Sequence, residues 1–197
     1  MNIVDRAKDI VLKPKETWEV IAQEPTAQKD LIMSYILPLA IIPAIASLIG
    51  YGFVGINLPL IGKVSSVEWG LNQAITSFAG TFLGIFISGW IISLLAPSYN
   101  TKLSMDDAIK LVAYSYTPSL IAGVLYLIPA LSIIAVVAGI YGLYILYLGF
   151  KPITKVADDK AGTYFVVSLL LIIVVFVVLS VVLGLILAGI GLQTIKY

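Results

Sequence analysis

The sequence predicts an all-α polytopic membrane protein: a bundle of five transmembrane helices preceded by short amphipathic helices at the membrane interface. Of its 197 residues, 60% are hydrophobic and only 12% are charged, whereas about a quarter of the residues in a soluble domain are charged. Mean hydropathy is +1.04. Several apolar runs are long enough to cross about 30 Å of hydrocarbon. They lack the alternation of apolar and polar residues that marks the strands of a transmembrane barrel.

Residues 1–30 are predicted to form a cytoplasmic amphipathic segment, followed by a five-span domain over residues 31–197. Apolar residues at helical spacing indicate one short helix near residues 3–11, with Arg6 on its polar face. Pro14 suits the first turn of a second short helix. Neither helix is long enough to span a bilayer. Two placements are open: on the inner membrane surface with Trp18 at headgroup depth, or packed on the inner face of the protein itself.

The five spans are predicted at about 31–56, 71–95, 108–128, 130–150 and 161–192. Pro38 and Pro43 each remove a backbone donor from the first span and are expected to kink it. The last span is longer than a bilayer needs, so it is expected to tilt or to project from the membrane. With the N-terminus inside, the inner segments hold ten of the twelve lysines and arginines. The positive-inside rule therefore predicts a cell-membrane protein (plasma or inner membrane) with a cytoplasmic N-terminus and Tyr197 outside.

Small residues recur every four positions in two spans, which predicts stripes where another helix can approach closely. The stripes are Thr76, Gly80, Gly84 and Ser88 in the second span, and Ser180, Gly184 and Ala188 in the last. Packing within one chain and dimerisation are both open. The tryptophans Trp18, Trp69 and Trp90 are expected at the membrane interfaces, where indole rings concentrate.

The hairpin over residues 108–151 combines tyrosines, glycines and a proline in the same half of both spans. Pro118 has no N–H, so the carbonyl of Tyr114 loses its usual helical partner. We expect a hydroxyl from Thr117, Tyr144 or Tyr147, or a trapped water, to satisfy it. These rings either serve only packing and interface roles or line a groove for a lipid headgroup or peptide. The candidates for this polar core or ligand groove are Tyr114, Tyr116, Thr117, Pro118, Tyr141, Tyr144 and Tyr147.

The residue types present argue against an enzyme. The chain has no histidine and no cysteine, and its spans carry no ionisable acid or base at depth other than tyrosine. Proton-coupled carriers, voltage sensors and pumps depend on such groups, and intramembrane proteases need a nucleophile with its base, or a metal. We therefore expect no catalytic residue, no cofactor and no metal site, and the net charge of +1 predicts no nucleic-acid partner. The aspartate pairs at 106–107 and 158–159 are interpreted as helix caps.

Three stretches of the hairpin share a pattern of tyrosine, proline and glycine in apolar helices. They read A-Y-S-Y-T-P-S-L at 113–120, I-P-A-L at 128–131 and G-I-Y-G-L-Y-I-L-Y-L-G at 139–149, and Pro14-Lys-Glu-Thr-Trp18 agrees with them. This pattern resembles the YIP family, the Ypt-interacting-protein-like five-span membrane proteins, and specifically its prokaryotic branch. The resemblance implies a five-helix fold with a cytoplasmic N-terminus. Eukaryotic members partner Rab-type GTPases and carry a D-L-Y-G-P-type motif near the first span. Here Asp30-Leu31 continues Ile-Met-Ser-Tyr, so GTPase binding is not carried over.

Taken together, these patterns favour a non-enzymatic integral membrane protein that organises or adapts a membrane or a membrane complex. Its expected partners are the lipid bilayer and other membrane proteins or a second copy of itself. The alternative is a small permease or channel for a neutral or weakly polar solute. Such a path would be lined by the hydroxyl side chains of Thr76, Ser77, Ser88, Ser115 and Thr117. A cavity reaching mid-membrane would favour transport, and close packing would favour the organising role.

Overall fold

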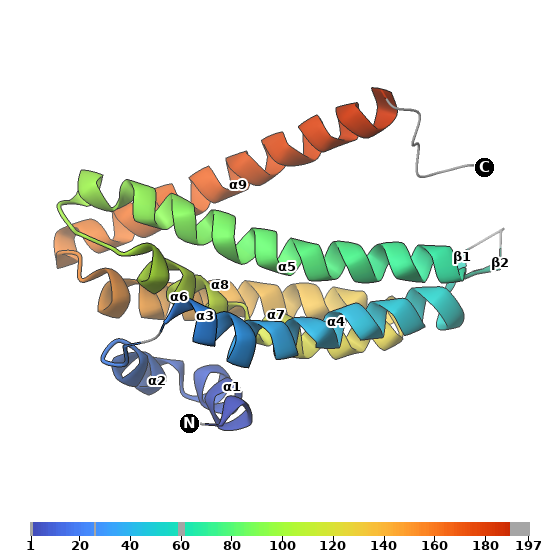
Figure 1. Ribbon diagram of the computed structural model, residues 1–197, viewed down its shortest axis with the longest axis horizontal. Helices are drawn as coiled ribbons and strands as arrows, with labels where there is room; N and C mark the ends of the chain where they lie inside the picture. Colours follow the sequence, from blue (N-terminus) through green and yellow to red (C-terminus); the bar gives the residue numbers. More distant parts are fainter. Residues whose placement is uncertain (1, 26, 59–61, 190–197) are drawn as a thin grey trace.

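Long helices run alongside one another in a bundle, and two short helices lie across one of its ends (Figure 1). This computed structural model describes residues 2–25, 27–58 and 62–189. The short helices are α1 (Ile3–Leu12) and α2 (Pro14–Ile21). The elements that follow are α3 (Gln28–Leu31), η1 (Ile32–Ile36), α4 (Leu37–Ile49), η2 (Gly50–Val54), β1 (Ile56–Leu58), β2 (Gly62–Val64), α5 (Val67–Leu95), η3 (Ala96–Tyr99), α6 (Met105–Ser115), α7 (Thr117–Ala122), η4 (Gly123–Leu127), η5 (Pro129–Leu131), α8 (Ser132–Thr154) and α9 (Asp158–Gly189).

The described helices confirm the predicted class, an all-α polytopic membrane protein. Four helical stretches are long and apolar enough to cross a membrane: Gln28–Val54, Val67–Tyr99, Pro129–Thr154 and Asp158–Leu179. The stretch Met105–Ser115 and its continuation Thr117–Leu127 meet at a bend of 42°, and together they make a fifth. The third predicted span is therefore a broken helix. Pro118 explains the break, because it removes a backbone donor just after the bend.

The first span continues through both of its prolines. Pro38 falls in the first turn of α4, after the π-helical turn η1, and Pro43 lies buried inside the helix. A π-turn widens the helix by pairing each N–H one residue further back. A second π-turn, η2, ends the span at Gly55, whose φ of 73° is a conformation that favours glycine. The departures from α-helical geometry thus flank α4.

The connection after the first span is a short antiparallel hairpin in which Ile56 of β1 pairs with Val64 of β2. Ser66 then caps α5, because its Oγ accepts a hydrogen bond of 3.1 Å from the backbone N–H of Trp69. As a result α5 begins at Val67, earlier than the predicted start at 71. Trp69 lies in its first turn, half-buried, with its ring centroid 4.9 Å from that of Tyr51.

Glycines allow close helix contacts near the hairpin end of the bundle. Gly70 of α5 lies against the backbone of Gly52 and the carbonyl of Leu48 in the first span. Gly50 of η2 lies directly against the backbone carbonyl of Tyr126 in η4. At each position a Cβ atom would meet backbone atoms that cannot rotate away. Close packing at this end therefore depends on these glycines.

The small-residue stripe of α5 is only half covered by the chain. Ser88 is buried, and Gly84 packs against the ring and hydroxyl of Tyr116. Thr76 and Gly80 are exposed, and no described atom lies within 4 Å of a Cβ built on Gly80. Trp90 on the same helix is 54% exposed. The stripe therefore contributes to packing within the chain only in its second half.

Helix α9 diverges from α5 along its length (Figure 1). Its first turns are anchored: Tyr164 is fully buried, donates its hydroxyl to the carbonyl of Ile92 and stacks on Tyr99 with centroids 4.6 Å apart. Beyond Phe165, most of its apolar side chains up to residue 179 are exposed or half-exposed. The side chains of Ser180, Gly184 and Ala188, and all of Tyr197, lie outside what the structure describes.

Candidate functional site

The best-defined polar arrangement in the described residues is the surface where α1 and α2 rest against the bundle, which we term the N-terminal junction. Its residues come from the N-terminal segment (Arg6, Val11, Trp18, Glu24) and from the first span, α6, α7 and α8 (Tyr35, Lys110, Tyr114, Thr117, Tyr141, Ile145). Four of these contacts join segments 82 to 130 residues apart in sequence.

Trp18 is the central side chain of the junction. The face of α2 that carries Trp18 and Ile21 turns toward α8, and both side chains are 0% exposed. The indole Nε1 donates to the backbone carbonyl of Ile145 over 2.9 Å. The ring lies directly on Gly149, where any Cβ would collide with it. Of the two placements open from the sequence, the second holds for this residue: protein atoms surround Trp18, in place of the expected lipid headgroups.

Two cations are buried under the segment that follows α2. Arg6, expected on the polar face of α1, is 6% exposed, and its Nη2 donates to both carboxylate oxygens of Glu24 at 2.5 and 2.6 Å. Its guanidinium also lies 5.8 Å from the ring centroid of Tyr114, within cation–π range. Lys110 is 3% exposed, donates to the backbone carbonyl of Glu24 and pairs with Asp107, both at 3.0 Å. The charges at the junction are therefore matched in pairs.

A chain of hydroxyls satisfies the carbonyl that Pro118 leaves without a helical donor. The Thr117 hydroxyl donates to the Tyr114 carbonyl over 2.7 Å. The hydroxyl of Tyr35 lies 2.7 Å from the same Thr117 oxygen. Since the single proton of Thr117 is used for the carbonyl, Tyr35 must donate to Thr117. The Tyr35 and Tyr114 rings also pack together, with centroids 4.7 Å apart.

The remaining tyrosines of the predicted groove lie in separate places. Tyr116 points to α5, where it contacts Gly84 and hydrogen-bonds Ser88. Tyr141 donates its hydroxyl to the carbonyl of Val11 over 2.7 Å and so joins the junction. Tyr144 and Tyr147 are 51% and 54% exposed on α8. Both were possible donors to the Tyr114 carbonyl, but Thr117 makes that hydrogen bond. The seven candidates thus do not form one groove.

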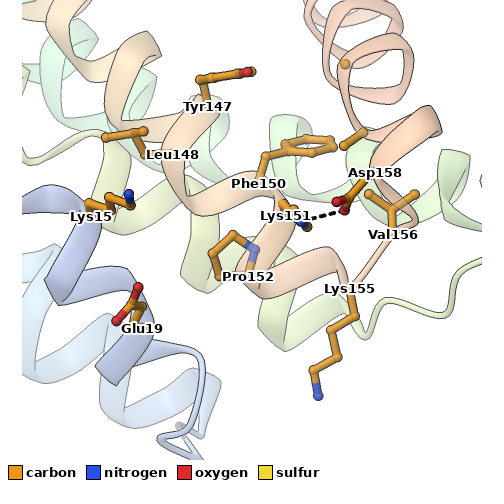
Figure 2. Close-up of a pocket in the computed structure, with 12 residues that line it drawn as sticks. Lys15, Glu19, Tyr147, Leu148, Phe150, Lys151, Pro152, Lys155, Val156 and Asp158 are labelled. Carbon is orange, nitrogen blue, oxygen red and sulfur yellow. Dashed lines mark ion pairs between the residues drawn. The ribbon is translucent and has the colours of Figure 1, made fainter.

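Two cavities open at the same end of the bundle. The first, about 890 Å³, lies between α2, α8 and the start of α9 (Figure 2). The second, about 810 Å³, lies along the connection from α5 to α6. In the first, Lys15 and Glu19 project from α2, and an ion pair of 2.5 Å between Lys151 and Asp158 joins α8 to α9 (Figure 2).

Comparison with known protein families shows which family the chain belongs to. A family model described as the Yip1 domain matches residues 8–193. The chain belongs to the Yip1 family. The match begins inside α1 and covers every span, so α2 and the second half of α1 fall within the Yip1 domain. No curated protein and no solved structure matches the chain.

Some residues of this Yip1 domain's junction were not singled out from the sequence. Tyr35 carries no local signal, because its partners lie 82 residues away along the chain. Arg6 and Lys110 resembled ordinary solvent-facing charges at helical spacing. Within residues 2–25, 27–58 and 62–189, no three histidine, cysteine or acidic residues gather where they could hold a metal ion. Asp107 accepts from the Ser104 hydroxyl at 2.7 Å in a capping arrangement.

Proposed function

We propose that this Yip1-family protein is non-enzymatic and organises or adapts a membrane or a membrane complex. The observation that supports this best is how the polar side chains of its spans are used. Ser115 donates to the Leu111 carbonyl at 2.7 Å, Ser88 bonds Tyr116, and Thr117 bonds both Tyr35 and Tyr114. Each is buried and bonded to the protein. Ser88 and Thr117 join different helices, whereas Ser115 bonds within α6.

The permease alternative required five hydroxyl side chains along one path. Thr76 lies on an exposed face of α5 and bonds Asn72 at 3.2 Å, whereas Ser115 and Thr117 are buried around the bend between α6 and α7. The two cavities described above lie at one end of the bundle. This distribution supports a closely packed membrane bundle against which α1 and α2 are docked.

We expect no solute flux above background when the purified protein is reconstituted into liposomes. Stopped-flow light scattering with glycerol and urea should give the same swelling rates with and without protein. In the same preparations, cryo-electron microscopy should show vesicle size or shape changing with the protein-to-lipid ratio, because an organising protein acts on the bilayer itself. Saturable flux together with unchanged vesicles would contradict the proposed role and support a permease.

We further propose that the end carrying α1 and α2 faces the cytoplasm, in the cell membrane. Ten of the twelve lysines and arginines belong to segments at that end, and Lys63 and Lys196 are the two others. Such an excess marks the cytoplasmic side. The bilayer is the direct partner, with other membrane proteins or a second copy as further partners. Nothing in the motifs supports a Rab-type GTPase.

The absence of cysteine from the sequence makes this orientation simple to test. Single-cysteine variants Lys63→Cys, in β2, and Lys102→Cys, between η3 and α6, place one thiol at each end. A membrane-impermeant maleimide added to intact cells should label Lys63→Cys and leave Lys102→Cys unlabelled until the cells are opened. The reverse pattern would show that the N-terminus lies outside.

A further inference from the structure

The cavity between α2, α8 and α9 has the form of a ligand site. Its volume of about 890 Å³ lies within the range of small-molecule sites, about 300–1,000 Å³. Its walls come from an amphipathic helix outside the predicted spans and from the ends of two candidate spans, Pro129–Thr154 and Asp158–Leu179. We therefore place the cavity at the level of the membrane surface, where the ligand that suits it best is amphipathic, with a polar part in water and an apolar part in lipid.

The lining changes character along the bundle axis. Tyr147 and Leu148 of α8, with Ala161 and Gly162 of α9, line its deeper part. The charged lining residues are Lys15, Glu19, Lys151, Lys155 and Asp158. At about 1.5 Å per residue, Lys151 and Asp158 lie about 5 Å nearer the helix ends than these apolar residues, and Lys155 lies about 10 Å nearer. A molecule with a charged head and an apolar tail matches this arrangement of a charged rim and an apolar deeper part.

The charge of the rim favours an anion. The lining holds three lysines and two carboxylates. One of the carboxylates, Asp158, already forms an ion pair with Lys151. Among the described residues, neither Lys15 nor Lys155 forms an ion pair within 4 Å. Figure 2 shows Lys15 projecting from α2 on one side of the cavity, and Lys155 extending away from the Lys151–Asp158 pair. Both lysines line the cavity, so its rim carries positive charge that no described carboxylate neutralises in an ion pair.

We propose that this cavity binds one anionic phospholipid, with its phosphate at the rim that carries Lys15 and Lys155 and the start of an acyl chain along Tyr147 and Gly162. Tyr147 packs against Phe165, with ring centroids 5.3 Å apart, but is still 54% exposed, which leaves part of its ring open to a chain. The site would tie α2 to the α8–α9 connection through a lipid. This assignment rests on the cavity and its charges and stands independently of the proposed organising role.

Gly162 offers a way to fill the cavity without disturbing the fold. No described atom lies within 4 Å of a Cβ built there, and Gly162 lines the cavity, so we expect a leucine side chain to be accommodated and to take up part of that space. Gly80 on α5 is a matched control, because it also has open space around its Cβ and lies away from the cavity. Both substitutions replace an exposed helical glycine.

The test is native mass spectrometry of the detergent-purified full chain with equal amounts of phosphatidylglycerol and phosphatidylcholine. We expect the wild type to retain one phosphatidylglycerol preferentially. Lys15→Gln with Lys155→Gln should lower that retention by about fivefold for each lysine removed. Gly162→Leu should reduce binding of the lipid while Gly80→Leu retains it. The charge control is Lys8→Gln with Lys29→Gln, two exposed lysines outside the cavity, which should behave as the wild type.

Three results would overturn the proposal. Equal retention of the two lipids would show that the head charge is not recognised. Equal losses in the cavity variants and their controls would show that any anionic lipid binding takes place elsewhere. Inorganic phosphate or glycerol phosphate displacing phosphatidylglycerol at comparable concentration would show a simple anion site in which the acyl chain contributes nothing.

Discussion

Replacing Trp18 with alanine is expected to release α1 and α2 from the bundle. The substitution removes a fully buried indole, its hydrogen bond to the Ile145 carbonyl and its contact with Gly149. Truncating a buried tryptophan to alanine typically costs about 3–5 kcal/mol. Because α1 packs on α2 as well as on the bundle, the loss weakens the junction as a whole. Limited trypsin digestion should therefore cut the variant quickly after Lys8 and Lys15, while the spans stay intact.

The control for this experiment is Trp90→Ala, which removes the same side chain from an exposed position on α5. It should leave the rate of N-terminal cleavage unchanged. If Trp18→Ala resisted trypsin as well as the wild type does, the junction would be held by its other contacts. The central place given to the indole would then be wrong.

Replacing Gly50 with alanine is expected to destabilise the opposite end of the bundle. The new methyl group would collide with the backbone carbonyl of Tyr126 in η4, and a backbone atom cannot turn aside as a side chain can. Overpacking of this kind costs about 1–3 kcal/mol and occasionally more. We expect the upper part of this range. Thermal unfolding of the detergent-solubilised protein should show a clearly lower Tm.

Gly80→Ala is the matched comparison for Gly50→Ala. It makes the same chemical change in a helix, but at a place where no described atom lies within 4 Å. Alanine is favoured over glycine in a helix by about 1 kcal/mol, so this variant should be equally or more stable than the wild type. Equal melting of the Gly50 and Gly80 variants would rule out the tight contact between η2 and η4.

The sequence was sufficient to predict the class, the approximate spans and the family, because each depends on local composition or on a continuous motif. Charge-free apolar runs identify spans without any tertiary information. The boundaries were less accurate where capping decides them. Ser66 begins α5 early because of one hydrogen bond between side chain and backbone. The break in the third span was not predicted: Pro118 marks the missing backbone donor locally, but the bend itself depends on packing.

The candidate site was predicted only in part, since its contacts join distant segments. Thr117 was among the donors considered for the Tyr114 carbonyl, because Pro118 made that need visible locally. Tyr35, the next donor in that chain, could not be found this way. Arg6 was assigned to the polar face of α1, and its burial depends on Glu24 and Tyr114 folding over it. Periodicity describes one helix at a time and does not report which charges a neighbouring segment will cover.

The hydrogen bond from Trp18 to Ile145 also has a consequence for biogenesis. Its two partners are 127 residues apart, so the N-terminal helices leave the ribosome long before the fourth span that receives them. At about 5–20 residues per second, that delay is roughly 6 to 25 s. Throughout this interval the apolar face of α2 has no α8 to bury it and is accessible to chaperones or to the bilayer surface. Docking of α1 and α2 is therefore a late event in maturation, and it occurs only in a chain whose fourth helix has already been inserted.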